Sequence, residues 1–385
     1  MEPTKDGLYK FDEMNFYVLE SMDDLVRVID SNKNIIYANR SMLKKMKFDP
    51  VGKPCKCKDR NTTELIFKEG FFPLCLVERE KNNYTTIFRE ITIGNKIYSV
   101  KSSPIIKENK EVVGSVEVFR DITEESKAKF KILKANKKMR EDITFAKNIQ
   151  SKSLPAKEGY VGVDFDYIYI PSEQLSGDFF DIIEIDDNRI GFYIADVAGH
   201  GVTASILTMF IRQSMRNLNE RGKLIKPSMI LAKLRDIFSD LNLEDNEYFT
   251  LLYGLYNRKT KVLTYANGGS TTRPLHIRKD KVEFLNSKGL PISGIFAGIK
   301  YEDYEIKLKS GDVVLLYTDG IIEFKSLNGE QYGENRLIES VRGNEADFID
   351  KIMESFGSFV KNATVSDDIA LLFEKLSIRK TITKA

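Results

Sequence analysis

Residues 176–201 read SGDFFDIIEIDDNRIGFYIADVAGHG, and this stretch decides the fold of the chain. Residues 179–185 and 190–195 are two short apolar runs separated by polar turn residues, a pattern that predicts two neighbouring strands joined by a tight turn. Asp178 opens the first run and Asp196 closes the second. Antiparallel pairing would therefore bring both carboxylates to the same end of one hairpin.

Aspartates at strand ends recur in two distant segments. Asp178 or Asp196 alone is read more simply as a turn residue or a helix N-cap. However, Asp319 follows the apolar run 313–317 in the sequence YTDG, and Asp367 precedes the last apolar run in VSDD. Carboxylate oxygens are the ligands of hard divalent cations, and no plausible cysteine or histidine set accompanies them. The four aspartates therefore favour a site for Mg²⁺ or Mn²⁺ over one for zinc.

Four motifs occur in a characteristic order along the chain: SGDFFD, DVAGHG, LKSGDVVLLYTDGIIE and SDDIALL. Their order and spacing resemble the SpoIIE-like bacterial branch of the PPM metal-dependent serine/threonine phosphatases, over about residues 159–376. The chain departs from that branch in two places. Ser176 occupies a position where that branch often has a glycine. The segment ANGGSTTRPL from Ala266 replaces a common NAGHxPP motif, so this loop lacks the motif's histidine.

The resemblance implies catalysis by two Mn²⁺ or Mg²⁺ ions, with a hydroxide between them attacking the phosphate and no phosphoenzyme formed. Asp196 would be the bridging ligand, and the backbone carbonyl of Val197 would complete the shell of one ion. Asp178, Asp319 and Asp367 would hold the outer positions. These five residues are the predicted metal ligands.

The chain has only two histidines, and one of them lies beside the predicted site. His200 follows Asp196 closely and is able to donate a proton to the serine leaving group, because imidazole titrates near neutral pH. It can equally be a residue that shapes the turn into the next helix, and the sequence leaves both readings open. His276 lies in a strand-like run and is interpreted as structural. Asp181 and Asp368 are interpreted as supporting or strand-end carboxylates.

The chain has 385 residues, which suggests two domains. Its net charge of +2, with many charges of both signs, indicates neither nucleic acid nor a membrane surface as a partner. It shows no apolar run long enough to span a membrane and no apolar signal core at its start, so a cytoplasmic location is expected. Three cysteines, Cys55, Cys57 and Cys75, suit free thiols in a reducing compartment; a metal or redox site is the alternative.

Residues 10–123 are expected to form a first domain, a small antiparallel sheet with helices across one face. The phrases VRVIDSNKNIIYANRSM, VGKPC and VVGSVEVFRDITEESK resemble a PAS sensory domain, including a DIT triad from Asp121 to Thr123. This segment contains no histidine, which excludes an axial histidine for haem. The sequence does not identify a ligand.

Residues 124–155 are expected to form one continuous linker helix, because no glycine occurs there and the only proline is Pro155 at its end. An apolar seam recurs at steps of three and four residues, which favours a dimeric coiled coil. The alternative is an amphipathic helix packed on its own domain. The seam consists of Ala128, Ile132, Ala135, Met139, Ile143, Ala146 and Ile149.

Residues 156–377 are expected to form the catalytic domain, followed by a tail at 378–385. Mostly antiparallel strands with helices in pairs predict an α-β-β-α sandwich, which the PPM resemblance also implies, so the whole chain is classed as α+β. A helix over 201–219 should cover a sheet through Ile206, Phe210 and Met215. A second over 227–241 should bury Ile230, Leu231, Leu234 and Phe238.

Together these features predict a PAS-regulated phosphatase that forms a homodimer through the linker helix. The resemblance implies a phosphoserine or phosphothreonine protein as substrate, typically an anti-sigma-factor antagonist. Two other hypotheses remain: a catalytically silent scaffold that binds a phosphorylated partner, and an enzyme acting on a small phosphoester. Retention of all four aspartates weighs against the scaffold.

Overall fold

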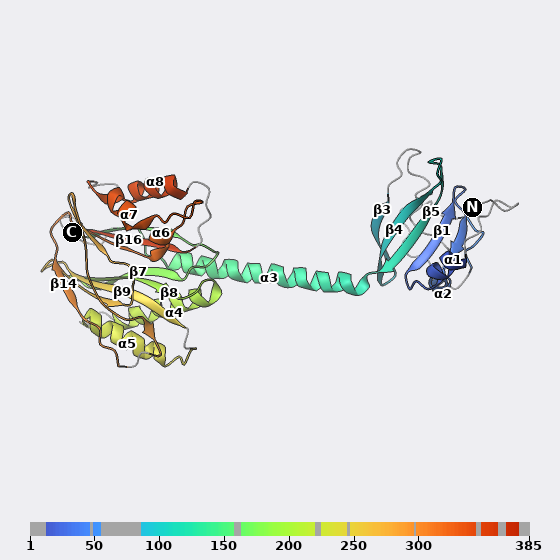
Figure 1. Cartoon of the computed structure of the whole chain (residues 1–385). Coiled ribbons are helices and arrows are strands. Elements are labelled where there is room, and N and C mark those ends of the chain that lie inside the picture. The colour runs from blue at the N-terminus through green and yellow to red at the C-terminus, as the bar shows by residue number, and fades with distance from the viewer. Residues whose placement is uncertain are drawn as a thin grey trace, which may run out of the picture. The chain divides into compact units, whose positions relative to one another are not determined.

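A computed structural model describes residues 13–46, 49–54, 86–157, 163–219, 225–244, 247–295, 298–343, 348–360 and 367–376. The chain divides into two compact units, Met1–Lys138 and Met139–Ala385 (Figure 1). The three cysteines and the tail at 378–385 lie outside the described residues. Among the helices that are described, none combines the length and the apolar character needed to cross a membrane.

The N-terminal unit is built on one five-stranded antiparallel sheet in the order β2-β1-β5-β4-β3. Its strands are β1 (Leu25–Asp30), β2 (Ile35–Ala38), β3 (Ile87–Ile93), β4 (Lys96–Ile106) and β5 (Val112–Asp121), and its short helices are α1 (Glu13–Glu20) and α2 (Arg40–Met46). This confirms the antiparallel sheet expected from the sequence.

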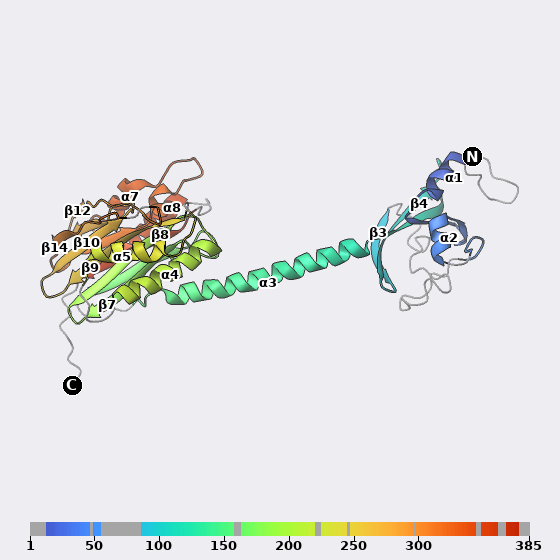
Figure 2. The same ribbon diagram turned by 90° about the horizontal axis from the view of Figure 1, so that it is seen from below.

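The sequence predicts helices across one face of this sheet, and that prediction is wrong for the described helices. Met42 of α2 packs with Leu25 and Phe119. Leu19 of α1 packs with Val26, whose side chain points to the opposite face because successive strand residues alternate. Figure 2 shows the two helices apart from each other against the strands. The described helices therefore cover both faces of the sheet.

A single helix, α3 (Thr123–Ser153), spans the boundary between the units. It is continuous as predicted and ends just before Pro155. Most of its predicted seam is exposed on the single chain, with exposures of 61% for Ile132, 61% for Met139 and 46% for Ile149, whereas Ile143 and Ala146 are partly buried. The coiled coil stays a prediction.

The C-terminal unit contains two stacked antiparallel sheets. The first has the order β14-β10-β9-β8-β7 with β13 beside β9, and the second has the order β12-β11-β15-β16-β6. The bounds of the first sheet are β7 (Asp178–Asp186), β8 (Arg189–Val197), β9 (Tyr248–Asn257), β10 (Val262–Gly268), β13 (Ile292–Ser293) and β14 (Tyr304–Lys307). Those of the second are β6 (Val163–Ile170), β11 (Leu275–Arg278), β12 (Lys281–Phe284), β15 (Val313–Tyr317) and β16 (Ile369–Leu376).

Apolar side chains from both sheets meet between them. Phe180 and Phe192 of the first sheet share one buried cluster with Leu316 and Leu372 of the second. Two further buried clusters fix the outer layers, one under α4 (Val202–Leu218) and α5 (Pro227–Ser239), the other under α6 (Asp319–Glu323), α7 (Gly333–Val341) and α8 (Phe348–Val360). Figure 1 shows these two groups of helices on opposite sides of the sheets. The predicted α-β-β-α sandwich is confirmed.

One helix face was predicted incorrectly. In α4, Met215 is buried and Phe210 is partly buried, but Ile206 is 63% exposed. The buried positions of α4 include Ala204, Leu207 and Ile211, which follow the spacing of one helical face. All four predicted core residues of α5 are buried.

Candidate active site

The hairpin of β7 and β8 brings two predicted site residues opposite each other. Asp178 and Asp196 are Cα partners in the antiparallel register. Asp178 is only 2% exposed, and Asp196 is partly buried. The expectation that both carboxylates occupy the same end of this hairpin is confirmed.

The second sheet brings Asp319 and Asp367 to neighbouring positions. Asp319 begins α6 and is separated from β15 only by Thr318, and Asp367 lies just before β16, the strand that pairs with β15. A small cavity of about 10 Å³, about the size of one water molecule, is lined by Asp196, Thr250 and Asp319 together with the loop at 270–272. The cavity shows that the carboxylate ends of the two sheets adjoin.

A hydroxyl group joins the two sheets at this point. Thr318 Oγ1 donates a hydrogen bond of 2.7 Å to Asp178 Oδ2 and accepts one of 3.0 Å from the backbone N–H of Ala370. Thr318 is buried between β15 and α6. Asp178 on the first sheet is therefore oriented by a residue of the second sheet.

Burial, and then repulsion from neighbouring carboxylates, raises the pKa of Asp178, Asp196 and Asp319. Burial, followed by repulsion from Asp196, raises the pKa of Asp178 well above its ordinary value. Burial and the charges of Asp319, Asp367 and Asp368 raise the pKa of Asp196 to about 7. Burial and Asp367 likewise raise the pKa of Asp319. The four predicted ligands thus lie within electrostatic reach of one another, and their mutual repulsion adds to the effect of burial.

The chemistry of this donor set fits a hard divalent cation, although the side chains do not form a complete shell. In the described part of the chain, no three acidic, histidine or cysteine side chains converge closely enough to hold an ion as they stand. Two backbone oxygens lie near the start of β7. A Cβ placed on Gly177 would lie 3.0 Å from the carbonyl oxygen of Val197 and 2.9 Å from that of Gly199, so both carbonyls approach the residue before Asp178.

His200 lies on the turn between β8 and α4, between two glycines with positive φ, Gly199 at 90° and Gly201 at 81°. Its side chain is 70% exposed, and its Nδ1 lies 3.0 Å from Glu173 Oε1. The imidazole is thus open to solvent and is oriented by Glu173, a residue that the sequence did not single out.

Asp368 and Asp181 hold the surroundings of the site in different ways. Asp368 accepts hydrogen bonds from the backbone N–H groups of Ser172, at 2.7 Å, and Gly177, at 2.6 Å, and so fixes the loop that leads into β7. Asp181 is fully buried and pairs with Arg216 Nε at 2.7 Å, which ties β7 to α4. Both act as supporting carboxylates.

The last turn of α3 holds the same loop through Gln150, a residue that no sequence pattern marks as functional. The side chain of Gln150 is buried, donates to the carbonyl of Ser176 at 2.8 Å and accepts from the N–H of Ser176 at 3.1 Å. It also donates to Thr208 Oγ1 of α4 at 3.2 Å. Ser176 Oγ in turn accepts from the N–H of Asp178 at 3.1 Å. The linker helix is therefore two hydrogen bonds from a predicted metal ligand.

The loop that lacks the common histidine is held by other polar groups. Asn267 Oδ1 accepts from the N–H of Ser270 at 2.7 Å, and Thr272 Oγ1 donates to the carbonyl of Tyr317 at 2.7 Å. Ser270, Thr271 and Thr272 line the small cavity beside Asp196. This loop therefore places hydroxyl-bearing side chains beside the cavity, where the resembling family commonly has a histidine.

His276 is structural, as interpreted from the sequence. It is buried in β11, and its Nε2 lies 3.0 Å from Asp312 Oδ2. Arg278 also binds Asp312, at 2.8 Å through Nε. This cluster braces the turn before β15.

Comparison with known proteins identifies the C-terminal half. Residues 186–377 match the family described as Stage II sporulation protein E (SpoIIE). The chain is 31% identical over 205 residues to the phosphoserine phosphatase RsbU of Bacillus subtilis, covering 52% of this chain and 60% of RsbU. It is 26% identical over 185 residues to the phosphoserine phosphatase RsbP of the same organism, covering 47% and 45%.

A solved structure shows the same fold. The SiaA-PP2C domain of Pseudomonas aeruginosa superposes with a TM-score of 0.55 at 20% identity, covering 63% of this chain and 98% of that domain. The chain spans about half to three fifths of the length of the two curated relatives it matches. The sandwich, the family match and these relatives together show that the C-terminal half of the chain is a SpoIIE-type serine phosphatase domain of the PPM family.

Proposed function

We propose that the protein is a metal-dependent phosphatase that removes phosphate from serine or threonine of a protein partner. The observation that carries this proposal is that Asp196 and Asp319, from different sheets, line one small cavity, while Asp178 lies opposite Asp196 in its hairpin and Asp367 precedes the strand beside β15. Two of the relatives are named phosphoserine phosphatases.

The carboxylates would hold two Mn²⁺ or Mg²⁺ ions. Asp196 is assigned the bridging position, because it pairs with Asp178 in the hairpin and lines the same cavity as Asp319. Asp178, Asp319 and Asp367 take the outer positions, and the Val197 carbonyl adds a neutral oxygen. Such ions, when bound, lower the pKa of a water and neutralise charge on the phosphoryl oxygens.

Protein side chains carry out the other parts of the proposed reaction, which are orientation of a metal ligand and proton donation. The Thr318 hydroxyl keeps Asp178 in one orientation. His200, open to solvent and paired with Glu173, donates a proton to the departing serine oxygen. Glu173 supports this role by holding the imidazole in one orientation through Nδ1.

The partner is proposed to be a phosphorylated anti-sigma-factor antagonist, as the SpoIIE-like resemblance implies. The test is release of phosphate from a phosphoserine antagonist protein with manganese, compared with para-nitrophenyl phosphate and repeated with Asp319→Asn. Manganese-dependent release from the protein, lost in Asp319→Asn, is expected. Preference for the small ester would reject the protein substrate, and tight binding without release would instead indicate a scaffold.

Regulation is proposed to come from the N-terminal unit, read as a PAS-type sensor, through α3. Support comes from the antiparallel sheet of that unit, from the unbroken helix and from the bonds of Gln150 to Ser176. The exposed seam of α3 would pair with a second copy of the chain. Deleting residues 1–122 should change the phosphatase rate, and an unchanged rate would reject regulation by the N-terminal unit. Sedimentation of the full chain should show a dimer, and a monomer would reject pairing through α3.

A further inference from the structure

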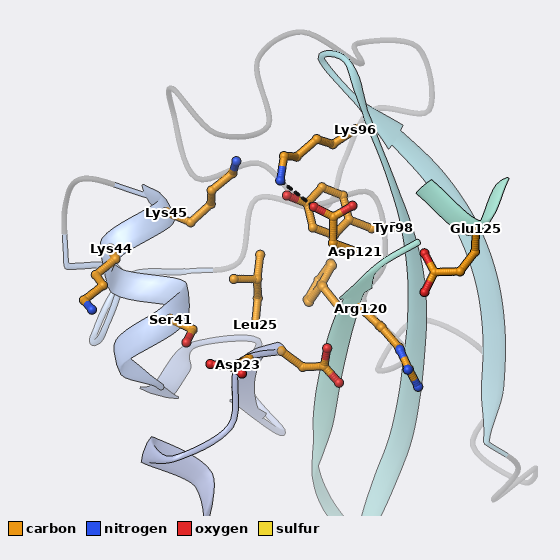
Figure 3. Close-up of a pocket in the computed structure, with 12 residues that line it drawn as sticks. Asp23, Leu25, Ser41, Lys44, Lys45, Lys96, Tyr98, Arg120, Asp121 and Glu125 are labelled. Carbon is orange, nitrogen blue, oxygen red and sulfur yellow. Dashed lines mark hydrogen bonds and ion pairs between the residues drawn. The ribbon is translucent and has the colours of Figure 1, made fainter. Parts of the chain in front are cut away.

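The two units differ in the charges that line their pockets. A pocket of about 560 Å³ in the N-terminal unit is lined by acidic and basic side chains in equal number (Figure 3). Its charged residues are Asp23, Asp24, Asp121, Glu125, Lys44, Lys45, Lys96 and Arg120. These charges favour neither an anion nor a cation as ligand. The small cavity between Asp196 and Asp319 differs, because no lysine or arginine is among the described residues that line it.

Hydroxyl groups line this cavity in place of basic groups. Thr318 and Thr272 donate hydrogen bonds within the fold, each at 2.7 Å, and Ser270 Oγ lies 3.0 Å from Thr272 Oγ1. Thr250 and Thr271 also line the cavity. Across the described residues, no hydrogen bond engages the hydroxyl of either of these two threonines. Both hydroxyls therefore keep their donors for a ligand.

Thr250 lies beside Asp196 on one face of the first sheet. The two residues are Cα partners in the register of β8 and β9. Directly opposed residues project their side chains to the same face, with Cβ atoms about 5 Å apart. That face is turned toward the second sheet, because Leu252, two positions further along β9, belongs to the cluster between the sheets. Thr250 is only partly buried, so its hydroxyl lies at the open end of the gap between the sheets.

Thr271 reaches the same cavity from the loop after β10. The residues on both sides of it are fixed. Asn267 Oδ1 accepts from the N–H of Ser270 at 2.7 Å, and Thr272 is buried and held by its bond to the carbonyl of Tyr317. Thr271 itself is exposed. The loop therefore presents an exposed threonine at a fixed position beside the carboxylates.

We propose that Thr250 and Thr271 bind the phosphoryl group of the substrate, each hydroxyl donating a hydrogen bond to one of its oxygens. This inference rests on the proposed phosphatase function. Phosphoryl oxygens are strong acceptors, and donors aimed at them are favourable in a site that excludes water. A lysine or arginine in the same place would pair with the aspartates and compete with the metal ions, whereas a neutral hydroxyl does not.

A contact to the phosphoryl group has a characteristic effect on substrates. Every phosphoester carries this group, so loss of the contact should weaken a phosphoserine protein and para-nitrophenyl phosphate to the same extent. A residue that docks the protein partner would instead affect the protein alone. Loss of one hydrogen bond to a charged group should weaken binding about tenfold.

The test is binding of inorganic phosphate to the full chain saturated with magnesium, measured by calorimetry. Thr250→Val and Thr271→Val should each raise the Kd for phosphate about tenfold. Thr250→Ser and Thr271→Ser keep the hydroxyl and should stay close to the parent. Thr260→Val, in the exposed turn at the other end of β9, is the matched control and should change nothing.

Magnesium affinity and melting temperature separate a substrate contact from a structural role, and both should be unchanged in the valine variants. Phosphate affinity equal to the parent's in both valine variants, or a parent protein that binds no phosphate, would overturn the inference. A loss of phosphate affinity that merely follows a loss of magnesium affinity would also overturn it. If the parent releases no phosphate from any phosphoester but binds it through the two threonines, the proposed function fails and this inference stands.

Discussion

Replacement of Gln150 by alanine tests how the linker helix supports the active site. Gln150 is 4% exposed and makes two hydrogen bonds with the backbone of Ser176 and a third with Thr208. The alanine variant would leave a buried N–H and a buried C=O of Ser176 without their partner. At about 1–3 kcal/mol for each of these two unsatisfied groups, the C-terminal unit should lose roughly 2–6 kcal/mol of its free energy of unfolding.

The effect on metal binding follows from the same contacts. Ser176 Oγ accepts from the N–H of Asp178, so a looser Ser176 leaves a predicted metal ligand less well placed. Losing a group that orients a metal ligand typically weakens metal affinity about 10–100-fold. We therefore expect the manganese concentration that gives half-maximal phosphate release to rise about 10–100-fold in Gln150→Ala, with a smaller change in rate at saturating manganese.

Two further variants isolate the hydrogen bonds. Gln150→Glu has the same shape but cannot donate to the Ser176 carbonyl, so its manganese requirement should also rise. Asn148→Ala, at an exposed position of the same helix, is the control and should match the parent protein. Manganese titration of phosphate release and thermal unfolding are measured for all three. Equal half-saturation in Gln150→Ala and Asn148→Ala would refute the argument that α3 positions Asp178.

Three other predictions concern the C-terminal unit. Thr318→Val removes the hydroxyl that orients Asp178 and should raise the manganese requirement about tenfold in the same titration; an unchanged requirement would show that the hydroxyl is dispensable. Burial alone would raise the pKa of Asp312, but hydrogen bonds led by that from Arg278 lower it to about 2 from 3.8. Because this folded-state pKa is depressed, Asp312 should stabilise the fold by about 2 kcal/mol above pH 4 and lose that contribution as the pH falls from about 4 to 2. Acid unfolding of Asp312→Asn should therefore show a shallower loss of stability over that interval than the parent, and parallel curves would contradict this. Manganese at about 100 times its Kd should raise the free energy of unfolding by about 2.7 kcal/mol. Chelation with EDTA should reverse this gain, and Asp319→Asn should not show it. Melting temperatures with and without the metal measure the effect.

The sequence predicted the parts of the site that depend on local pattern and strand geometry. Two apolar runs with a turn between them define an antiparallel hairpin, and that geometry alone places Asp178 opposite Asp196. The sandwich followed from the number and order of strands. The burial of α5 followed from its apolar spacing, since its predicted core residues all lie on one helical face.

Other features depend on contacts between distant segments, and no local pattern carries them. Gln150 and Ser176 are 26 positions apart, and a glutamine on a charged helix has nothing that marks it as buried. Ile206 shows the opposite error. Its side chain is apolar, but α4 meets the sheet through the face that carries Leu207 and Ile211, so Ile206 is left in solvent.

Two buried aspartates of β7 show the physical difference between a supporting carboxylate, Asp181, and a predicted metal ligand, Asp178. Asp178 and Asp181 lie three residues apart in one apolar run, and both are almost completely buried. Asp181 faces α4, where Arg216 approaches at 2.7 Å and Arg212 at 3.4 Å, so its charge is compensated within the fold. Asp178 faces a second carboxylate, Asp196, and its pKa is raised by burial and by that neighbour. A buried charge is costly unless it is paired, so an acid opposed by acids is stabilised by a proton or by a cation from outside the chain, whereas an acid opposed by arginines needs neither. The identity of the facing element, which only the folded structure supplies, therefore decides which aspartate is available for chemistry.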